Sequence, residues 1–384
     1  MPTGSLDQVD AAEGNAQFTA QNTAGATTGP IQIDAAGIIR DFSRARKVQP
    51  SSSFGLECAV DWVPPEERFP ISIAACPVCR GREAEPRFQL RDFDYKLVTC
   101  TVCGLGRLNP LPDPQTIANF YPPEYYGVTG AKFVPAIESL IRIVGARQAR
   151  ALTRGLAARS RVLDIGCGRG VLLKTLADMG FDTHGFEISE NAAAGADTRA
   201  QIRIAPSLAQ AGYRGRYFDS VILWHVLEHL PDPRETLLEI RRIMRRGARL
   251  AVSVPNFSSA QARWAGPAWF HLDLPRHLYH FPRTALKRLM TECGFECVTE
   301  HHFSLRQNPF GWVQSALNKF PQIPRNGLYT LLKRGQSANG HCNASLNQWM
   351  KVAYAAGMPM ALAASIAETL FRSGASISIS AIAR

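Results

Sequence analysis

The sequence of 384 residues has no apolar run long enough to cross a bilayer, and no basic N-terminal segment followed by an apolar stretch. The longest uncharged apolar run extends from Val352 to Ala367 and is interrupted by Gly357 and Pro359. It falls short of the roughly 20 residues that a membrane-spanning helix needs. Without a signal peptide, we expect a cytoplasmic protein, and peripheral contact with the inner face of a membrane stays open.

Positive charge is in excess, but the chain has no long run of basic residues. Its 43 Lys and Arg residues against 32 Asp and Glu residues give a formal net charge of +11. Such an excess favours anionic surroundings, including nucleic acid and anionic lipid. Because the arginines are scattered, we interpret it first as a solvated basic surface.

The nine cysteines do not form the even set that a secreted disulfide framework has. Four of them form two Cys-x-x-Cys pairs, Cys76 with Cys79 and Cys100 with Cys103, separated by 20 residues. This spacing predicts a tetrahedral zinc site, and four thiolates would leave no open position for water, so the site should be structural. A redox pair or free thiols are the alternative. The other thiols considered are expected to be buried or half-buried: Cys167, Cys293, Cys297 and Cys342.

Composition and periodicity divide the chain into segments. Residues 1–60 are rich in Ala, Gly, Thr, Gln and Ser, and we expect a disordered tail. The cysteine module and a Pro- and Tyr-rich linker would occupy residues 70–127. Residues 316–384 are predicted to contain helices over 317–332 and 352–371 and a closing strand over 375–380.

Strand and helix patterns alternate between these segments. Apolar spacing predicts a helix over 136–158, and the regions after it predict four buried strands and two helices: 161–165, 171–179, 183–186, 219–224, 234–244 and 249–254. This alternation predicts an α/β fold with a mostly parallel sheet and helices on both faces. Such sheets bind ligands at the carboxyl ends of their strands.

A glycine-rich turn follows the first of these strands. Gly166, Gly168 and Gly170 alternate with other residues, which permits a tight turn and a close approach of a ligand to the backbone. Glu187 lies 23 residues after Asp164, at the end of the next strand. In dinucleotide folds, a carboxylate about 20 residues beyond the loop holds ribose hydroxyls. The GxGxG spacing argues against NAD, and a plain tight turn with a surface Glu is the alternative.

Together these motifs resemble class I S-adenosylmethionine-dependent methyltransferases. The nearest group is bacterial, is related to ubiquinone-biosynthesis O-methyltransferases and sugar methyltransferases, and carries an N-terminal zinc-binding module. The resemblance covers roughly residues 76–315 and rests on 162–170, 185–189, 217–230, 253–256 and 273–281. It implies a Rossmann-like methyltransferase fold with a seven-stranded sheet over residues 136–315, plus a small zinc-ribbon-like module.

The resemblance also implies where S-adenosylmethionine binds. Asp164 and the glycine loop would hold the methionine part, Glu187 both ribose hydroxyls, and Ile188 the adenine. Many relatives carry an Asp beside the adenine amino group where this chain has Ser207, which is expected to substitute or to leave a backbone contact. The full expected set is Asp164, Gly166, Cys167, Gly168, Gly170, Glu187, Ile188, Ser207 and Trp224.

His225, Glu228 and His229 match an inverted zinc-protease motif literally. That motif needs both histidines on one face of a continuous helix. Here a strand precedes the motif and the prolines at 231 and 233 end any helix, so we discard the protease interpretation. In the resembling family this elbow faces the methyl group. The three side chains are then candidates for substrate contact, general base, a divalent-metal site near Glu228 and His229, or simple packing.

A second cluster follows the last predicted strand of the domain, where this fold often adds substrate-binding insertions: His271, Arg276, His277, Tyr279 and His280. Histidine near its ordinary pKa suits proton removal from an acceptor hydroxyl. We expect His277 to be the base, with His225 and then His229 as the alternatives. Trp264, Trp269 and Phe270 would line an apolar pocket or pack in the core.

The sequence therefore predicts methyl transfer from S-adenosylmethionine to a small-molecule acceptor or to a glycan- or lipid-linked envelope metabolite, with oxygen as the acceptor atom. The zinc module is expected to wall or cover the substrate pocket. The oligomeric state does not follow from the sequence. Two alternatives stay open: a zinc-dependent nucleic-acid-binding protein on an inactive methyltransferase fold, and an RNA methyltransferase.

Overall fold

The computed structural model describes residues 32–33, 39–40, 59–122, 135–194, 196–333 and 344–384. The chain divides into two units, Met1–Ser53 and Phe54–Arg384. In the first unit the described residues form two short antiparallel strands, β1 (Gln32–Ile33) and β2 (Ile39–Arg40). The rest of the predicted disordered tail lies outside the described residues, and so does Cys342.

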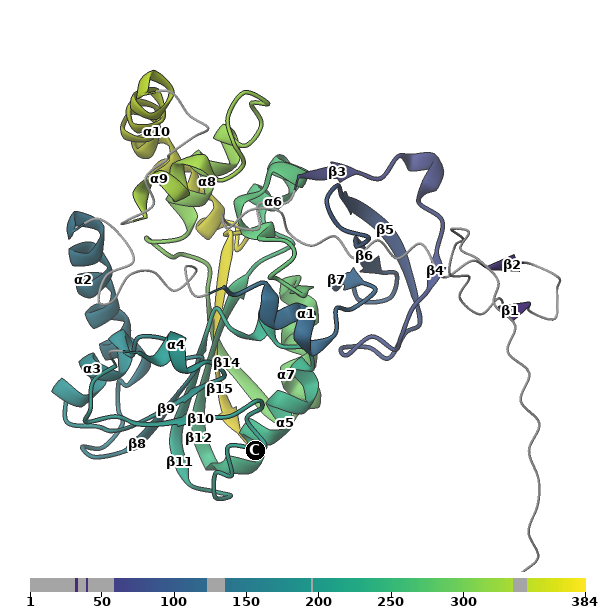
Figure 1. Ribbon diagram of the computed structural model, residues 1–384. Helices are drawn as coiled ribbons and strands as arrows, with labels where there is room; N and C mark the ends of the chain where they lie inside the picture. Colours follow the sequence, from purple (N-terminus) through teal and green to yellow (C-terminus); the bar gives the residue numbers. More distant parts are fainter. Residues whose placement is uncertain (1–31, 34–38, 41–58, 123–134, 195, 334–343) are drawn as a thin grey trace, which may run out of the picture. The chain divides into compact units, whose positions relative to one another are not determined.

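The second unit is built on a seven-stranded sheet (Figure 1). Its strands lie in the order β10 (Gln201–Ile204), β9 (Asp182–Glu187), β8 (Arg161–Ile165), β11 (Phe218–Trp224), β12 (Met244–Pro255), β15 (Ser376–Ala383) and β14 (Phe295–His301). Neighbouring strands from β10 to β12 are parallel, and β15 is antiparallel to both β12 and β14. This confirms the predicted α/β fold with a mostly parallel sheet. The C-terminal strand lies inside the sheet and not at its edge.

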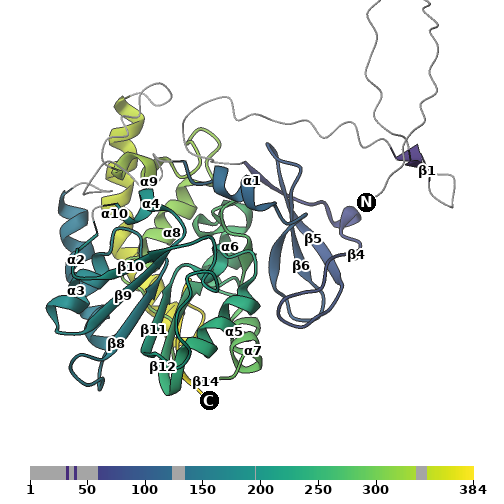
Figure 2. The same ribbon diagram turned by 60° about the horizontal axis from the view of Figure 1, so that its bottom comes forward.

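Helices cover both faces of this sheet (Figures 1 and 2). One face carries α2 (Pro135–Leu152) and α3 (Val171–Asp178), whose apolar side chains pack on β8, β11 and β12. The other carries α5 (Pro233–Ile243) and α7 (Arg283–Glu292), which join the largest apolar cluster. The central strands β8 and β11 are buried on both faces, which explains their largely apolar sequences, whereas the edge strands β10 and β14 are mostly exposed.

The sequence of α5 shows why the helix begins and ends where it does. Asp232 caps its N-terminus by accepting a hydrogen bond from the Glu235 amide at 2.9 Å, and Pro233 occupies the first turn, where no amide donor is needed. The apolar residues at helix spacing are all buried: Leu237, Ile240 and Ile243. The helix thus starts directly after the histidine elbow and fixes it against the sheet.

The cysteine module forms a second, antiparallel sheet. Its strands lie in the order β13 (Tyr279–His280), β7 (Gly106–Asn109), β6 (Lys96–Cys100), β5 (Glu83–Leu90) and β3 (Val60–Trp62), with β4 (Ile71–Ser72) beside β5. The module's sheet therefore begins at Val60. β13 belongs to the methyltransferase-like segment in sequence but pairs with β7 of the module. The two parts share one apolar cluster, and α1 (Pro114–Asn119) follows the module.

The C-terminal segment differs from the prediction in two ways. The helix predicted over 317–332 is two helices, α8 (Asn308–Leu317) and α9 (Gly327–Leu332), because Pro321 and Pro324 interrupt it. Asn318 binds both the Ala268 carbonyl and the Asn326 side chain at the break. The last helix, α10 (Ala344–Leu370), is longer than predicted. By length and composition it is apolar enough to cross a membrane, contrary to the expectation from the shorter run.

Candidate active site

The glycine loop lies between β8 and α3, at the carboxyl end of the sheet. Gly166, Gly168 and Gly170 all have positive φ angles, +68°, +48° and +67°, in the left-handed region that favours glycine. A Cβ on Gly166 would lie 2.5 Å from Val226 Cγ2, so the loop packs directly against the histidine elbow. A Cβ on Gly168 would meet nothing within 4 Å, which leaves open space above this backbone. The loop can therefore approach a ligand closely.

Two carboxyl groups lie below this loop. Glu187, at the end of β9, accepts hydrogen bonds from the amides of Gly168 at 3.0 Å and Ile188 at 2.8 Å. Asp164, on β8, is buried, and burial together with the charge of Glu187 raises its pKa to about 8. Glu187 thus fixes the loop from the neighbouring strand, where a carboxylate can also bind diol hydroxyls.

The other predicted cofactor residues surround the loop to different degrees. Cys167 is buried in the loop, and burial raises the pKa of its thiol. Ile188 is half-exposed after β9, and Trp224 is partly buried at the end of β11. Ser207 is exposed in the turn after β10, where it accepts a hydrogen bond from the Gln210 amide at 3.3 Å. All lie at the carboxyl ends of the strands, where this sheet class binds ligands.

The histidine elbow begins where β11 ends. His225 has a φ of +56°, a left-handed conformation that is strained for a residue with a side chain. Its Nδ1 lies 3.3 Å from Glu228 Oε1, and its Nε2 lies 3.5 Å from Ser376 Oγ. Only a short 3-10 helix follows, over Leu227–His229. The continuous helix that the protease motif requires is not formed, as the prolines predicted.

Glu228 is the most buried acid of this elbow, with an exposed fraction of 1%. Burial alone opposes its ionisation, but the hydrogen bond with His225 and the nearby His229 and His277 lower its pKa to about 2. Its Oε2 has no hydrogen-bond partner among the described residues. A buried carboxylate with one unpaired oxygen is costly unless a ligand, a cation or a proton donor completes it.

His229 and His277 meet beside this carboxylate, with ring centroids 4.5 Å apart. His229 Nδ1 lies 2.8 Å from the Tyr121 hydroxyl and 3.1 Å from the Arg276 carbonyl oxygen. This leaves its Nε2 without a hydrogen bond within the described part of the chain. The ring is half-buried. Hydrogen bonds at Nδ1 therefore fix the orientation of the His229 ring, and its Nε2 is available to a ligand.

His277 is more enclosed than its partner. Its Nδ1 lies 2.9 Å from the His271 carbonyl oxygen and its Nε2 lies 3.8 Å from Asp273 Oδ2. Burial, and the nearby His229, lower its pKa to about 3. Asp273 in turn binds Arg276, which, against the effect of burial, holds the pKa of that carboxyl well below its usual range. Both ring nitrogens of His277 thus face protein groups.

The remaining residues of the second predicted cluster are buried, and the His271 Nε2 and His280 Nδ1 atoms have no hydrogen-bond partner among the described residues. His280 Nε2 lies 3.0 Å from the Leu272 carbonyl oxygen, and the Tyr279 hydroxyl donates to the Pro231 carbonyl at 2.9 Å. Trp269 is fully buried and donates to Gln261, whereas Trp264 is half-exposed and lies against Trp312. The predicted aromatic wall is therefore divided between the core and the surface.

Two groups of side chains have the donor sets of metal sites. Ligand atoms of Glu228, His229 and His277 lie within 4.8 Å of one another. So do the thiols of the two Cys-x-x-Cys pairs: Cys76, Cys79, Cys100 and Cys103. The first group is the one that sequence placed near Glu228 and His229, now with His277 added from the second cluster.

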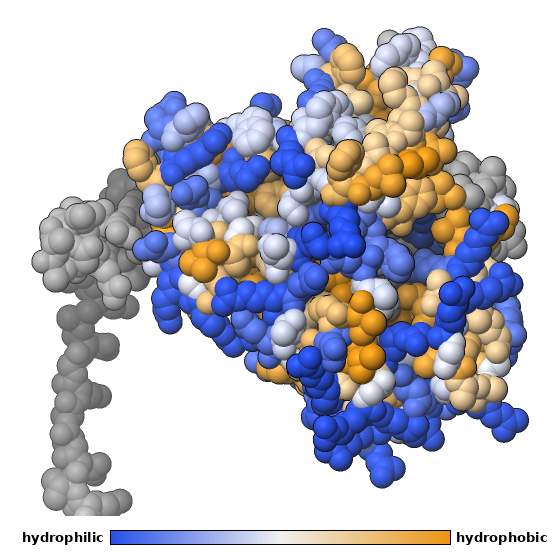
Figure 3. Space-filling model, turned by 180° about the vertical axis from the view of Figure 1, so that it is seen from behind, coloured by the Kyte–Doolittle hydropathy of each residue, from blue (hydrophilic) through white to orange (hydrophobic). Residues whose placement is uncertain are grey.

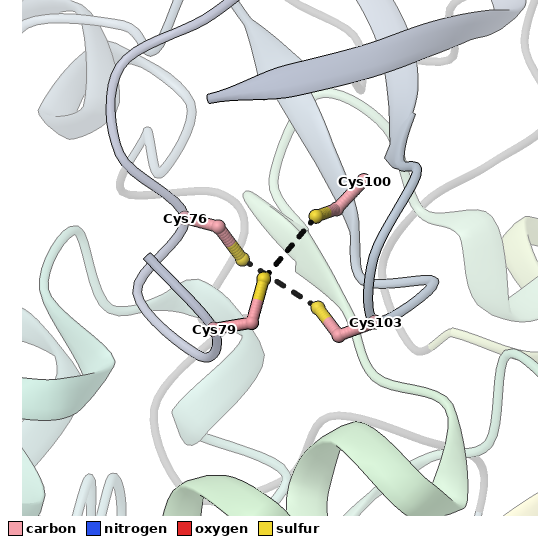
Figure 4. A group of neighbouring side chains, drawn as sticks. All are labelled: Cys76, Cys79, Cys100 and Cys103. Carbon is pink, nitrogen blue, oxygen red and sulfur yellow. Dashed lines mark hydrogen bonds between the residues drawn. The ribbon is translucent and has the colours of Figure 1, made fainter. Parts of the chain in front are cut away.

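The four thiols converge from two loops (Figure 4). The Sγ atoms of Cys76 and Cys103 are 3.6 Å apart, and those of Cys79 and Cys100 are 3.5 Å apart. A tetrahedral Zn²⁺ with Zn–S bonds of about 2.3 Å would separate its ligands by roughly 3.8 Å. The donor set and its spacing therefore fit zinc.

The two loops also repeat one backbone pattern. The Cys76 amide donates to the Gly81 carbonyl and its carbonyl accepts from the Arg80 amide. In the second loop, the Cys100 amide donates to the Leu105 carbonyl and its carbonyl accepts from the Gly104 amide. Arg80 and Gly104 both have positive φ. Each loop thus presents its thiols from the same tight turn.

Two residues that sequence reasoning missed connect the module to the elbow. Arg234 of α5 donates to the carbonyls of Pro77 and Val78 at 2.6 and 2.7 Å and also binds Glu292. Tyr121, just after α1, binds His229. Neither contact has a local signal, because the partners are more than a hundred residues apart. The linker motif Phe120–Tyr121–Pro122 was visible, but not the partner of its tyrosine.

Comparison with known proteins places the fold among characterised families. Residues 138–300 match the family model described as methyltransferase domain. The ubiquinone biosynthesis O-methyltransferase of Aromatoleum aromaticum is 29% identical over 177 residues, which cover 43% of this chain and 74% of the relative. The enzyme of the same name from Thiobacillus denitrificans is 28% identical over 172 residues, covering 41% and 72%.

Similar solved structures include an S-adenosylmethionine-dependent methyltransferase from Archaeoglobus fulgidus. It is 19% identical, the alignment covers 64% of this chain and 98% of that one, and the TM-score is 0.40. The family match ends at residue 300 and begins at residue 138, so the cysteine module lies outside it.

Proposed function

We propose that this S-adenosylmethionine-dependent methyltransferase, whose residues 138–300 match the methyltransferase domain model, methylates a hydroxyl oxygen of a small molecule. The observation that carries the proposal is the available Nε2 of His229, beside Glu228 and against the glycine loop through Val226. The O-methyltransferase names of the relatives support oxygen as the acceptor atom. Glycan- and lipid-linked hydroxyls belong to the same class of acceptor.

The cofactor would lie over the glycine loop. Glu187 would bind the ribose hydroxyls, Ile188 and Ser207 would flank the adenine, and Asp164 with the loop backbone would hold the methionine part. The open space above Gly168 admits such a ligand. Bound cofactor supplies an electrophilic methyl group, because the sulfonium makes that carbon positive. The remaining task of the protein is to align the acceptor and exclude water, which can supply ~7–11 kcal/mol of the barrier.

His229 is the base that the geometry favours among the three predicted candidates. His225 and His277 have both ring nitrogens directed at protein groups. His229 has one nitrogen held by Tyr121 and the Arg276 carbonyl, which orients the ring and leaves Nε2 to accept the hydroxyl proton. The preference therefore moves from His277 to His229, and His277 becomes a positioning residue.

Glu228, His229 and His277 are also the second candidate, a divalent-cation site. The observation that favours it is the buried Oε2 of Glu228, which lacks a hydrogen-bond partner within the described residues. One carboxylate and two imidazoles suit first-row divalent metals. If a cation is required, chelation lowers methyl transfer and added divalent metal restores it. If His229 acts as a plain base, chelation has no effect on the rate.

The cysteine module fits a structural zinc ion, and we propose that it walls the acceptor side of the site. Arg234 binds the backbone of the first cysteine loop, and β13 joins the sheet of the module to the segment that contains His277. A loop docked on α5 is poorly placed to bind nucleic acid. Methyl transfer to small hydroxylated acceptors is therefore tested first.

The test combines cofactor binding with transfer of a labelled methyl group. Titration calorimetry with S-adenosylhomocysteine should give micromolar binding that weakens about tenfold or more in Glu187→Ala, because each lost charge-assisted hydrogen bond contributes roughly 1.5–3 kcal/mol. His229→Asn should leave this affinity unchanged and lower kcat by about 10²–10⁴-fold on hydroxylated acceptors.

The exposed His301 on β14 provides the matched control. His301→Asn should change neither affinity nor kcat. Absence of S-adenosylhomocysteine binding to the wild type would overturn the cofactor assignment. Unchanged kcat in His229→Asn would overturn the base.

A further inference from the structure

The outward face of α10 is apolar over most of its length. From Val352 to Phe371 every exposed residue is apolar: Val352, Ala355, Ala356, Pro359, Met360, Leu362, Ala363, Ile366, Ala367, Leu370 and Phe371. Met360, Leu370 and Phe371 expose 75%, 77% and 83% of their surface. A helical run of this length extends about 30 Å. Soluble monomers rarely expose a continuous apolar surface of this size.

The opposite face of α10 is attached to the protein. Its buried residues are Met350, Ala361, Ser365 and Glu368. Glu368 accepts hydrogen bonds from the Gln261 amide at 3.1 Å and from Trp312 Nε1 at 3.0 Å. The helix is followed by β15, which lies inside the main sheet. A helix tied along its side to α8 and followed directly by a central strand cannot cross a bilayer without unfolding the sheet, so only the outward face is available.

Basic and aromatic side chains lie at both ends of this apolar face. Lys351 is exposed at the N-terminal end, beside Trp349, whose ring lies 6.4 Å from that of Phe320. Arg372 is exposed at the C-terminal end, where Arg263, Arg283 and Phe371 also line a hollow of about 760 Å³. Arg372 and Arg283 share Glu300, whereas Arg263 donates to the Ser258 carbonyl and the Ser373 hydroxyl and lies near Glu368, a buried acid that also lines the hollow. The ends of the face are therefore suited to phosphate groups.

We propose that α10 is a membrane-surface helix, which lies in the headgroup region of an anionic phospholipid bilayer. The apolar face would enter the boundary of the acyl chains, and Lys351, Arg263 and Arg372 would contact lipid phosphates. An apolar face with basic and aromatic residues at its margins is typical of helices that lie in this plane. The net charge of +11 acts in the same direction. Figure 3, seen from behind, shows hydrophobic surface gathered at the upper right, over α10.

A second copy of the chain is a less suitable occupant. Twofold pairing of two such helices would be antiparallel or would cross, and the antiparallel form brings the Lys351 end of one helix to the Arg372 end of the other. Like charges would then face each other at both ends of the contact, which disfavours the pairing. A lipid surface with negative phosphates has the complementary charge.

The test is sedimentation of the full chain with phospholipid vesicles. Wild type should bind vesicles of phosphatidylcholine with phosphatidylglycerol and bind much less to phosphatidylcholine alone, with binding that weakens as salt is raised. Met360→Glu/Leu370→Glu should weaken the partition coefficient about tenfold or more, since it places two charges on the apolar face. Lys351→Gln/Arg372→Gln should weaken binding to the anionic vesicles and leave the small residual binding to phosphatidylcholine unchanged.

Two exposed apolar residues elsewhere provide the matched control. Phe69 and Val298 are 71% and 56% exposed and lie outside α10. Phe69→Glu/Val298→Glu should bind vesicles as the wild type does. S-adenosylhomocysteine affinity, measured on every variant, separates this proposal from loss of folding and from failure of the methyltransferase site. Wild type that binds neither vesicle, or Met360→Glu/Leu370→Glu that binds as the wild type does, would overturn the proposal. So would a dimer that dissociates on that substitution without any vesicle binding.

Discussion

At the scale of single residues, the candidate site depends on groups whose charge is set by burial. Burial and the charge of the nearby Glu187 raise the pKa of Asp164 to about 8, so this carboxyl keeps its proton at neutral pH. In the unfolded chain the same carboxyl has its ordinary pKa of 3.8. Between these two values the unfolded chain has lost a proton that the folded protein retains. The group therefore makes the protein less stable as the pH rises from about 4 to about 8.

Asp164→Asn should remove this dependence. Relative to wild type, the variant should gain stability as the pH rises from about 5 to about 8, by at most about 1.4 kcal/mol per pH unit. The measurement is denaturant unfolding of both proteins across that range without cofactor. S-adenosylmethionine, whose sulfonium is positive, should lower the pKa of Asp164 and reduce the difference. A difference that stays constant with pH would contradict the assigned pKa.

Residue chemistry was predictable where the signal is local. The three glycines of the loop and Glu187 stand next to strand ends in the sequence, and strand, turn and helix are contiguous there. The side-chain partners were not predictable. Tyr121 reaches His229, and Arg234 reaches the Pro77 carbonyl, only after separate segments have folded against one another. The choice between His277 and His229 therefore needed the three-dimensional contacts of both rings.

At the scale of elements, the glycine loop that follows β8 packs against the histidine elbow that follows β11. This contact limits how closely the two segments can approach each other. Gly166 has no room for a Cβ, which would lie 2.5 Å from Val226 Cγ2, and its φ is +68°. Gly168 also has a positive φ, but a Cβ there would meet nothing within 4 Å. The two positions therefore separate backbone strain from steric contact.

Gly166→Ala should lower both the unfolding temperature and the affinity for S-adenosylhomocysteine, because the elbow must move. Strain and overpacking together cost about 2–4 kcal/mol. Gly168→Ala, the matched control, should cost about 1 kcal/mol in stability from backbone strain alone. Val226→Ala added to Gly166→Ala should restore part of the stability. If the two single variants are equally stable, the loop does not press against the elbow as described.

The elements themselves were predicted best where one periodicity is unbroken. β8 occupies the predicted residues 161–165, and α3 and α5 lie within one residue of their predicted bounds. The break between α8 and α9 was missed although Pro321 and Pro324 lie within it and proline interrupts a helix. Asn318 and the left-handed backbone of Asn326 fix its two ends. The strand β13 was missed because its pairing partner β7 is distant in sequence.

At the scale of the whole molecule, the cysteine module and the methyltransferase domain are one folded body within Phe54–Arg384. Several connections join them, among which β13 pairs with β7, Arg234 binds the first cysteine loop, and Tyr121 binds His229. A module attached only by its linker would lack such connections. Disturbing the cysteine cluster should therefore reach the site through β13, which directly follows the segment of His277.

Cys100→Ser tests this connection together with zinc binding. The purified wild type should contain about one zinc ion per chain, since four thiolates form one tetrahedral site. The variant should lose the metal and unfold at a lower temperature, by about 2–4 °C for each kcal/mol of lost stability. It should also lower kcat more than it weakens S-adenosylhomocysteine binding, because β13 and His277 lie on the proposed acceptor side, whereas Glu187 binds the amides of Gly168 and Ile188 within the proposed cofactor site.

The half-buried Cys297 on β14 is the matched control, since its thiol lies outside the cluster. Cys297→Ser should keep its zinc, its unfolding temperature and its kcat. Metal content by mass spectrometry, thermal unfolding and calorimetry with S-adenosylhomocysteine distinguish the outcomes. A zinc-free Cys100→Ser with unchanged kcat would show that the module stabilises the chain without shaping the site. Retention of zinc in that variant would remove Cys100 from the ligand set.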